Sequence, residues 1–153
     1  MTIRKATVGD IELLIRLRID YLTDGGSLTP EEETAVRTQL RQYFAKHIPG
    51  GSFIAIIAET DGAAASAAYL AISEKPANPA FITGITGTLL NVYTYPEYRR
   101  KGIAAKVIEK LIGEAKQAGV SYIDLSATAD GKPLYEKMGF TISSHTSMGM
   151  KLN

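Results

Sequence analysis

The sequence predicts an α/β domain in which a mixed β-sheet lies between helices. Three observations support this prediction: apolar residues recur at helical spacing in several segments, short apolar runs bounded by Gly and Pro are typical of strands, and the two patterns alternate. The expected order is β-α-α-β-β-β-α-β-α-β. The chain has 153 residues, and a domain commonly has about 100–200. Because no repeat or linker divides the chain, residues 1–153 are predicted to form a single domain.

The first third of the chain is predicted to contain one strand and two helices. Residues 2–6 form a short strand, and Thr7–Asp10 fits a capping box ahead of apolar residues at helical spacing over 11–22. A second helix is expected over Thr29–His47, because Thr is a good N-cap and the next residue is Pro. The Pro-Gly-Gly of residues 49–51 is expected to stop this helix.

The rest of the chain is predicted to be mostly β-structure around one amphipathic helix. A Gly-containing turn at residues 60–62 indicates a hairpin, and Gly119 is well placed to end the helix. The expected segments are strands at 52–59, 63–73 and 84–95, a loop at 74–83, the helix at 103–118, a strand at 120–127, a short helix at 133–138 and one or two closing strands at 141–152.

Composition excludes several classes of protein. The formal net charge is +1, which gives no broad basic surface for nucleic acid or anionic lipid. No apolar run approaches the roughly 20 residues that span a bilayer, and no secretory signal follows Met1. Cysteine is absent, which excludes a disulfide framework, a thiolate nucleophile and a Cys-ligated zinc. We therefore expect a soluble, cytoplasmic protein with no membrane or nucleic-acid partner and no metal.

The segment Asn91–Ala104 is the most informative part of the sequence. A strand ends, a basic turn follows, and a helix opens at Gly102, so free backbone N–H groups and the positive end of the helix dipole face outward. Arg99, Arg100 and Lys101 add positive charge. This arrangement favours a pocket for a phosphate or pyrophosphate. The alternative is a solvated basic turn that only starts a helix. The patterns G-x-G-x-x-G and G-x-x-x-x-G-K-[ST] are absent.

Two linked motifs resemble those of one enzyme family. Arg99–Ala104 matches Q/R-x-x-G-x-G/A, a signature of the GNAT superfamily of acyl-CoA-dependent N-acetyltransferases. Leu134–Phe140 resembles the second signature of that family, L-Y-x-K-x-G-F, at the expected distance, and Val92–Tyr98 resembles the strand and turn that precede the first. The resemblance covers the whole chain in element order and is specific over about residues 84–140. It implies the GNAT fold and acetyl transfer to an amine.

The resemblance also implies how acetyl-CoA, the co-substrate, is bound. Backbone N–H groups of residues 100 to 105 would hold the pyrophosphate. The pantetheine arm would lie along the strand that ends near Asn91–Tyr93, bonding main chain as a short extra strand does. Thr128 stands where many relatives carry an Asn that contacts the cofactor. The implied cofactor-binding residues are Val92, Tyr93, Thr94, Arg99, Arg100, Lys101, Gly102, Ile103, Ala104, Ala105 and Thr128.

Tyr135 and Asn91 are the residues expected to act in catalysis. The resemblance places Tyr135 where relatives have a general-acid tyrosine, and a Tyr pKa near ~10 keeps the phenol protonated at neutral pH. The alternative is a packing tyrosine on a short helix. Asn91 is polar in an apolar strand, so it orients the substrate or a water, or it satisfies a main-chain group where strands splay. A main-chain N–H of Val92 or Tyr93 is expected to meet the oxyanion.

The sequence identifies no general base. Some relatives carry Glu on the strand that precedes the first signature, where aligning the turn puts Gly87. The remaining candidates are Glu59, a chain of waters, or no protein base if the amine arrives neutral. His145 is a further candidate because histidine is a common general base, but a lone histidine near a chain end is expected at the surface.

The predicted function is an N-acetyltransferase that acts on the primary amine of a small molecule or peptide by direct attack on the thioester. The N-terminal helices and the loop at 74–83 are expected to form the acceptor site. The alternative is a non-catalytic acyl-CoA-binding module, which the missing strand carboxylate favours and Tyr135 disfavours. Tyrosines beside the basic turn also suggest a nucleic-acid surface, but the balanced charge argues against it. A homodimer is left open.

Overall fold

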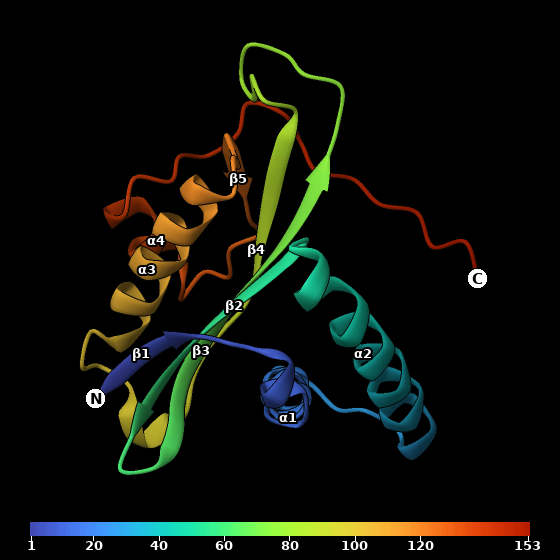
Figure 1. The fold of residues 1–153 in the computed structure, drawn as a ribbon, viewed down its shortest axis with the longest axis vertical. Helices are drawn as coiled ribbons and strands as arrows, with labels where there is room; N and C mark the ends of the chain where they lie inside the picture. The colour runs from blue at the N-terminus through green and yellow to red at the C-terminus, as the bar shows by residue number, and fades with distance from the viewer.

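The structure, a computed structural model, describes all residues from Met1 to Asn153. Its centre is a five-stranded sheet in the order β1-β2-β3-β4-β5 (Figure 1). Neighbouring strands are antiparallel from β1 to β4, and β5 is parallel to β4. The strands are β1 (Thr2–Lys5), β2 (Phe53–Thr60), β3 (Ala63–Glu74), β4 (Ile85–Thr94) and β5 (Tyr122–Asp124). The helices are α1 (Ile11–Asp24), α2 (Pro30–Gly50), α3 (Ile103–Gln117) and α4 (Lys132–Lys137), with 3-10 turns at Val8–Asp10 and Pro96–Tyr98.

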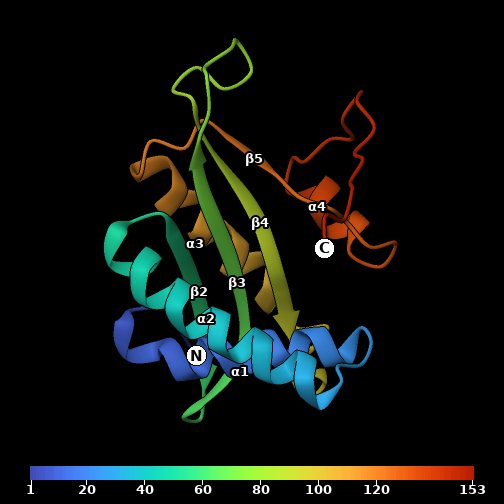
Figure 2. The same ribbon diagram turned by 90° about the vertical axis from the view of Figure 1, so that its right-hand side faces the viewer.

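Helices cover both faces of the sheet. α1 and α2 lie on one face, and α3 and α4 lie on the other (Figures 1 and 2). β2 is buried on both sides, so its apolar run is nearly continuous. Phe53, Ala55 and Ile57 join the core under α1 and α2, whereas Ile54 and Ile56 join the core under α3. The predicted mixed sheet between helices is confirmed. None of the helices combines the length and hydropathy of a membrane span.

The second helix begins where the sequence predicts and ends later. The Thr29 hydroxyl accepts a hydrogen bond from the Glu32 N–H, and the Glu32 carboxylate accepts one from the Thr29 N–H, which completes a capping box. The helix runs through Pro49, three residues beyond the expected end. Gly51, with a φ of 78°, is the residue that ends it, and its N–H donates to the Ile48 carbonyl. The glycine, rather than the proline, is therefore the stop.

β4 separates from β5 partway along its length. The two strands pair only over Thr86–Thr88 with Tyr122–Asp124, so β5 is shorter than the predicted strand at 120–127. On its other side, the register of β4 with β3 shifts around Asn91, whose φ is 54°. A left-handed residue within a strand marks a bulge, which bends the strand. The segment Leu89–Thr94 therefore has no strand partner on the β5 side, and we call it the fork.

The closing strands predicted at 141–152 are not formed. No strand follows α4, so the last β of the expected order is missing, and the chain beyond Phe140 runs exposed and away from the sheet (Figure 1). The apolar alternation of Met148, Met150 and Leu152 is typical of a strand. A strand also needs a sheet edge for its hydrogen bonds and a core for its apolar side. These residues meet neither within the chain, which is why the prediction was wrong.

Gly87 of β4 provides a test of packing against the neighbouring strand. A Cβ at this position would lie 2.8 Å from Cδ1 of Leu70, which is fully buried. We expect Gly87→Ala to lower the free energy of unfolding by about 1–3 kcal/mol, because the crowded core has to shift. The matched control is Gly113→Ala on α3, where a Cβ meets nothing within 4 Å; it should raise stability by up to about 1 kcal/mol. Urea unfolding measures both, and a Gly87→Ala protein as stable as the parent contradicts this packing.

Candidate functional site

The turn between β4 and α3 presents a row of free backbone N–H groups. Arg100 and Gly102 are both left-handed, with φ of 63° and 74°, and such turns aim successive N–H groups at one point. The N–H groups of residues 100 to 105 donate to no main-chain carbonyl. A Cβ on Gly102 would meet nothing within 4 Å, so the left-handed backbone, rather than crowding, is what favours glycine there. We call residues 100–105 the nest. A phosphate or pyrophosphate is the ligand that such a row of donors accommodates.

The basic side chains of the turn point in different directions. Arg99 is committed to the protein: its Nε donates to the Thr94 carbonyl at 2.7 Å, and its Nη2 lies 3.2 Å from the Asp24 carboxylate of α1. Its guanidinium also lies over the Tyr93 ring, 5.6 Å from the centroid. Lys101 is exposed and lies over Tyr98. Arg99 therefore anchors the turn to α1, and only Arg100 and Lys101 remain free for an anion in the nest.

The fork leads directly into the nest. Thr94 ends β4, the 3-10 turn Pro96–Tyr98 follows, and the nest begins two residues later. Within the fork, Val92 packs against the core under α3, whereas Tyr93 is buried towards α1, with its ring 6.2 Å from that of Tyr21. The structure thus joins an open strand edge to a row of amide donors. In the nest, Ile103 is buried under α3, and Ala104 and Ala105 are half-buried in its first turn.

Asn91 lies at the centre of the fork. Its side chain is 1% exposed, and its Oδ1 accepts a hydrogen bond from Nη1 of Arg18 at 3.3 Å. Its Nδ2 is buried without a partner. From the sequence, one of the two alternatives for Asn91 was a hydrogen bond to a main-chain group. The structure shows no such bond, because the one partner of the side-chain amide is Arg18. A buried donor left unpaired costs about 1–3 kcal/mol, and a water or a ligand oxygen would satisfy it.

The sequence analysis expects the N-terminal helices at the acceptor site, but it named no individual residue of α1. Arg18 and Tyr21 both reach the fork, with the Arg18 guanidinium 5.9 Å from the centroid of the Tyr21 ring. One signal was available: Arg18 stands at helical spacing in line with the apolar residues Leu14 and Ile15, so it is a charged residue on a buried face. The exposed loop at 74–83, in contrast, projects beyond the end of β3 (Figure 1).

Tyr135 is half-buried on α4 and faces the same region. Its ring meets that of Phe140 edge-on at 6.0 Å and packs against the core under α3. Burial raises the pKa of the Tyr135 phenol above its ordinary value of 10, and the Tyr21 phenol adds to the rise. A phenol with a raised pKa remains a proton donor at neutral pH.

Thr128 is exposed in the loop before α4. Its hydroxyl accepts a hydrogen bond from the Gly131 N–H at 3.1 Å, and its carbonyl accepts one from the Lys132 N–H at 3.0 Å. These bonds hold the turn that leads into α4. The hydroxyl can still donate a hydrogen bond to a ligand.

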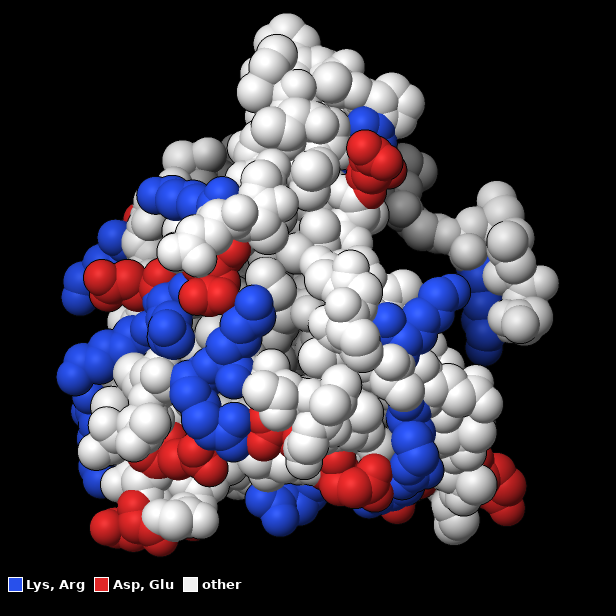
Figure 3. All heavy atoms as spheres, in the orientation of Figure 1, with Lys and Arg blue, Asp and Glu red and all other residues white.

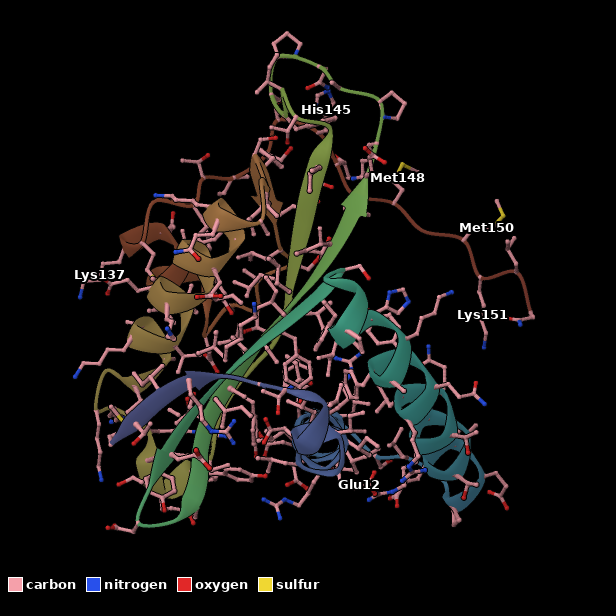
Figure 4. All side chains as sticks on the ribbon, viewed as in Figure 1. Glu12, Lys137, His145, Met148, Met150 and Lys151 are labelled. Atoms are coloured by element: carbon pink, nitrogen blue, oxygen red, sulfur yellow. The ribbon has the colours of Figure 1, made fainter.

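The side chains considered as general bases lie away from the fork. Glu59 lies near the end of β2, separated from β4 by β3, and its carboxylate accepts a hydrogen bond from Nε of Arg4 at 2.6 Å. His145 is in the exposed C-terminal segment that follows α4 (Figure 4). Two carboxylates of α1, those of Asp20 and Asp24, lie near Tyr93. Both are already engaged, because Asp20 accepts a hydrogen bond from the Tyr95 hydroxyl and Asp24 pairs with Arg99.

The surface seen in Figure 3 carries no continuous basic stripe. Lys and Arg gather over the side formed by α3, where Asp and Glu are interspersed with them; both charges also occur over the lower part of this face, and its upper part is mostly uncharged. No group of three or more His, Cys, Asp or Glu side chains is placed to hold a metal ion.

Comparisons with known proteins agree with this geometry. The model of the "Acetyltransferase (GNAT) family" matches residues 14–140. A glucosamine 6-phosphate N-acetyltransferase of Arabidopsis thaliana is 30% identical over 149 residues, which cover 93% of this chain and 91% of the relative.

Solved structures are similar over nearly the whole chain. A predicted acetyltransferase from Clostridium acetobutylicum, crystallised with acetyl-CoA, has a TM-score of 0.85 at 30% identity, covering 99% of this chain and 95% of that one. A GCN5-related N-acetyltransferase from Ralstonia eutropha has a TM-score of 0.82 at 25% identity, with 97% of each chain covered. The chain therefore belongs to the GNAT family of acetyltransferases and is an acyltransferase.

Proposed function

We propose that the protein transfers the acetyl group of acetyl-CoA to the primary amine of a small molecule by direct attack on the thioester. The observation that carries this proposal is the continuity of the fork and the nest. One ligand with an extended, amide-rich arm and a pyrophosphate fits both. The Clostridium relative, crystallised with acetyl-CoA at 30% identity, supports the same ligand.

The main chain supplies most of the proposed contacts to the co-substrate. The pyrophosphate takes the N–H groups of residues 100 to 105, with Arg100 and Lys101 at the rim. The pantetheine amides pair with the open edge of β4 along Val92–Thr94, as an added strand does. Thr128 lies across the fork in the loop after β5. Arg99 does not contact the co-substrate in this proposal, because its side chain is bound to Asp24 of α1; it contributes by fixing the position of the turn.

The proposed reaction needs three events at the thioester carbon. The neutral amine attacks the carbonyl carbon and forms the C–N bond, and the oxyanion is met by the N–H of Val92 or Tyr93. The C–S bond then breaks, and Tyr135 gives its proton to the departing thiolate. The amine loses its extra proton to water, because neither Glu59 nor His145 reaches the fork.

The acceptor is proposed to enter from the side of α1 and α2, because the co-substrate fills the gap between β4 and β5. Glucosamine 6-phosphate, the substrate in the name of the Arabidopsis relative, belongs in an acceptor panel together with amino acids and polyamines. A non-catalytic acyl-CoA-binding module is the second candidate, which the lack of a carboxylate at Gly87 favours. Thiol release with this panel distinguishes the two.

Coenzyme A is expected to protect the fold against heat. A ligand that binds only the native state adds about 2.7 kcal/mol at 100 times its dissociation constant, which raises the midpoint of a domain this size by about 5–10 °C. Pantetheine lacks the group that the nest binds, and NAD and ATP lack the arm that pairs with the fork, so each should protect less. Differential scanning fluorimetry measures all four. Equal protection by coenzyme A, NAD and ATP would show a generic polyphosphate site.

The nest itself is tested by Gly102→Glu. This variant puts a side chain on a left-handed residue and a carboxylate among anion-binding amides, so coenzyme A should no longer protect it. Gly113→Glu, an equal change of charge at an open site of α3, is the control and should keep the full shift. A folded Gly102→Glu protein that binds coenzyme A like the parent places the phosphates elsewhere.

Tyr135→Phe separates binding from chemistry. Because the hydroxyl acts only as the thiolate departs, its loss should lower turnover about 10²–10⁴-fold and leave the affinity for coenzyme A nearly unchanged. Burial raises the pKa of Tyr135 above its ordinary value, so the phenol stays protonated and the parent should lose no rate on the alkaline side between pH 7 and 9 through this group. Tyr122→Phe, on exposed β5, is the control. Unchanged turnover in Tyr135→Phe would mean that water protonates the thiolate.

A further inference from the structure

Arg18 is a half-buried cation with no carboxylate partner. It takes part in none of the ion pairs of the protein, although Arg4 and Arg99 nearby are both paired. Its one hydrogen bond goes to the neutral Asn91 amide at 3.3 Å. A guanidinium has five N–H donors. Most of the Arg18 donors therefore have no acceptor at the fork, and the positive charge has no carboxylate partner.

A cavity of about 250 Å³ lies beside this guanidinium, between α1, α2 and the sheet. Arg18 is its one charged residue, and Gln39, Tyr43 and Tyr69 are its other lining residues with a polar side-chain atom. No Asp or Glu lines it. Leu90, which also lines it, directly precedes Asn91 in β4. The cavity therefore adjoins the fork from the face of the sheet that α1 and α2 cover.

We propose that the acceptor amine carries an anionic substituent, a carboxylate or a phosphate, which Arg18 binds while the rest of the molecule fills this cavity. The proposal rests on the proposed acetyl transfer, because the cavity matters as an acceptor site only if an amine reacts at the fork. The planar guanidinium fork suits both anions. The cavity is smaller than the ~300–1,000 Å³ of most ligand pockets, so a small molecule fits and a peptide chain does not. A polyamine would bring further positive charge beside Arg18.

The test compares pairs of amines that differ only in the anion. Phenylalanine against phenylalaninamide probes a carboxylate, and glucosamine 6-phosphate against glucosamine probes a phosphate. The parent should prefer the anionic member of at least one pair about 10- to 100-fold in kcat/KM, the usual effect of a charged hydrogen bond. Whichever pair shows the preference identifies the anion.

Variants at Arg18 then show whether this side chain is the cause. Arg18→Met should abolish the preference by raising KM for the anionic amine alone, and Arg18→Lys should restore part of it. Arg37→Met, which removes an exposed arginine of α2, should leave it unchanged. Protection by coenzyme A must match the parent in every variant, which confirms folding and an intact nest.

The outcomes separate this proposal from the proposed function. Amines that react with no preference for an anion, or a preference that Arg18→Met retains, overturn the role of Arg18 but leave acetyl transfer intact. Failure of every amine to release thiol counts against acetyl transfer. In that case, thermal protection by the same amines in the presence of coenzyme A decides the role of Arg18: no extra protection by either anionic member overturns it.

A second, independent observation concerns the C-terminal segment. Met148, Met150 and Leu152 are 91%, 84% and 87% exposed, and they alternate with Gly149 and Lys151 as in a strand with one apolar face. Met148, Met150 and Lys151 lie along a segment that extends away from the sheet (Figure 4), whereas β5 is the edge strand of the sheet itself. An apolar strand pattern left in solvent needs a partner.

The sheet also ends in an open edge. β5 is last in the strand order, so its outer edge has no strand partner. An open edge is a site for pairing with another strand. Because each chain offers both a free strand and a free edge, two copies can satisfy each other reciprocally in a closed two-fold dimer. We infer that two copies exchange residues 147–152, with each segment adding a strand beyond β5 of the partner copy.

The absence of cysteine makes this exchange directly measurable. Met150→Cys and Tyr122→Cys are made as separate proteins, mixed in urea, refolded together and treated with a short bismaleimide. If the segments exchange, the Met150→Cys and Tyr122→Cys chains should become covalently linked to each other. A control mixture of Met150→Cys with Lys46→Cys, an exposed position on α2, should form far fewer linked pairs. Light scattering should give the mass of two chains for the full protein and of one chain after truncation at Phe140. A full-length monomer, or a link that forms only within a Met150→Cys/Tyr122→Cys double variant, overturns the exchange.

Discussion

The bulge at Asn91 is the constraint on which the site depends. A regular β4 would stay flat against both neighbours, and its main-chain groups would be used within the sheet. The left-handed φ of Asn91 bends the strand, and pairing with β5 stops after Thr88. Hydrogen-bonding groups in the middle of a sheet thereby become available to a ligand. The same bend turns the Asn91 side chain towards α1, where it meets Arg18.

α1 makes three polar contacts along its length, one with β3 and two with the chain that follows the fork. The Tyr69 hydroxyl donates to the Leu14 carbonyl at 2.6 Å, the Tyr95 hydroxyl donates to Asp20, and Arg99 pairs with Asp24. Burial, and then the bond to Asp20, raise the pKa of Tyr95 to about 12, so this phenol remains a donor over the whole neutral range. Each of these polar groups has a partner, which is why the unmatched Arg18 on the same helix stands apart from them.

The sequence was informative wherever the signal is local. Thr29 and Pro30 predict a helix start from neighbouring residues alone, and the turn at residues 99–104 predicts its own free amides. The role of Arg18 was not predictable in this way, because its partner Asn91 is 73 residues away in sequence. The closing strand at 141–152 failed for a related reason. The alternation of apolar residues shows which side chains would share one face of a strand. It does not show whether that strand can reach an open edge of the sheet.

The missing base limits which amines can react. A Glu at position 87 would displace the buried Leu70, so the strand is packed for a residue without a side chain. The two nearby carboxylates, Asp20 and Asp24, are already bonded to Tyr95 and Arg99, so in the proposed reaction only the neutral fraction of the amine attacks. An amine with a pKa near ~8 has more than about 100-fold more neutral molecules at pH 7 than a lysine-like amine near ~10.4. In the proposed reaction the acceptor is therefore selected twice: by shape and charge at Arg18 and the cavity, and by amine basicity at the fork.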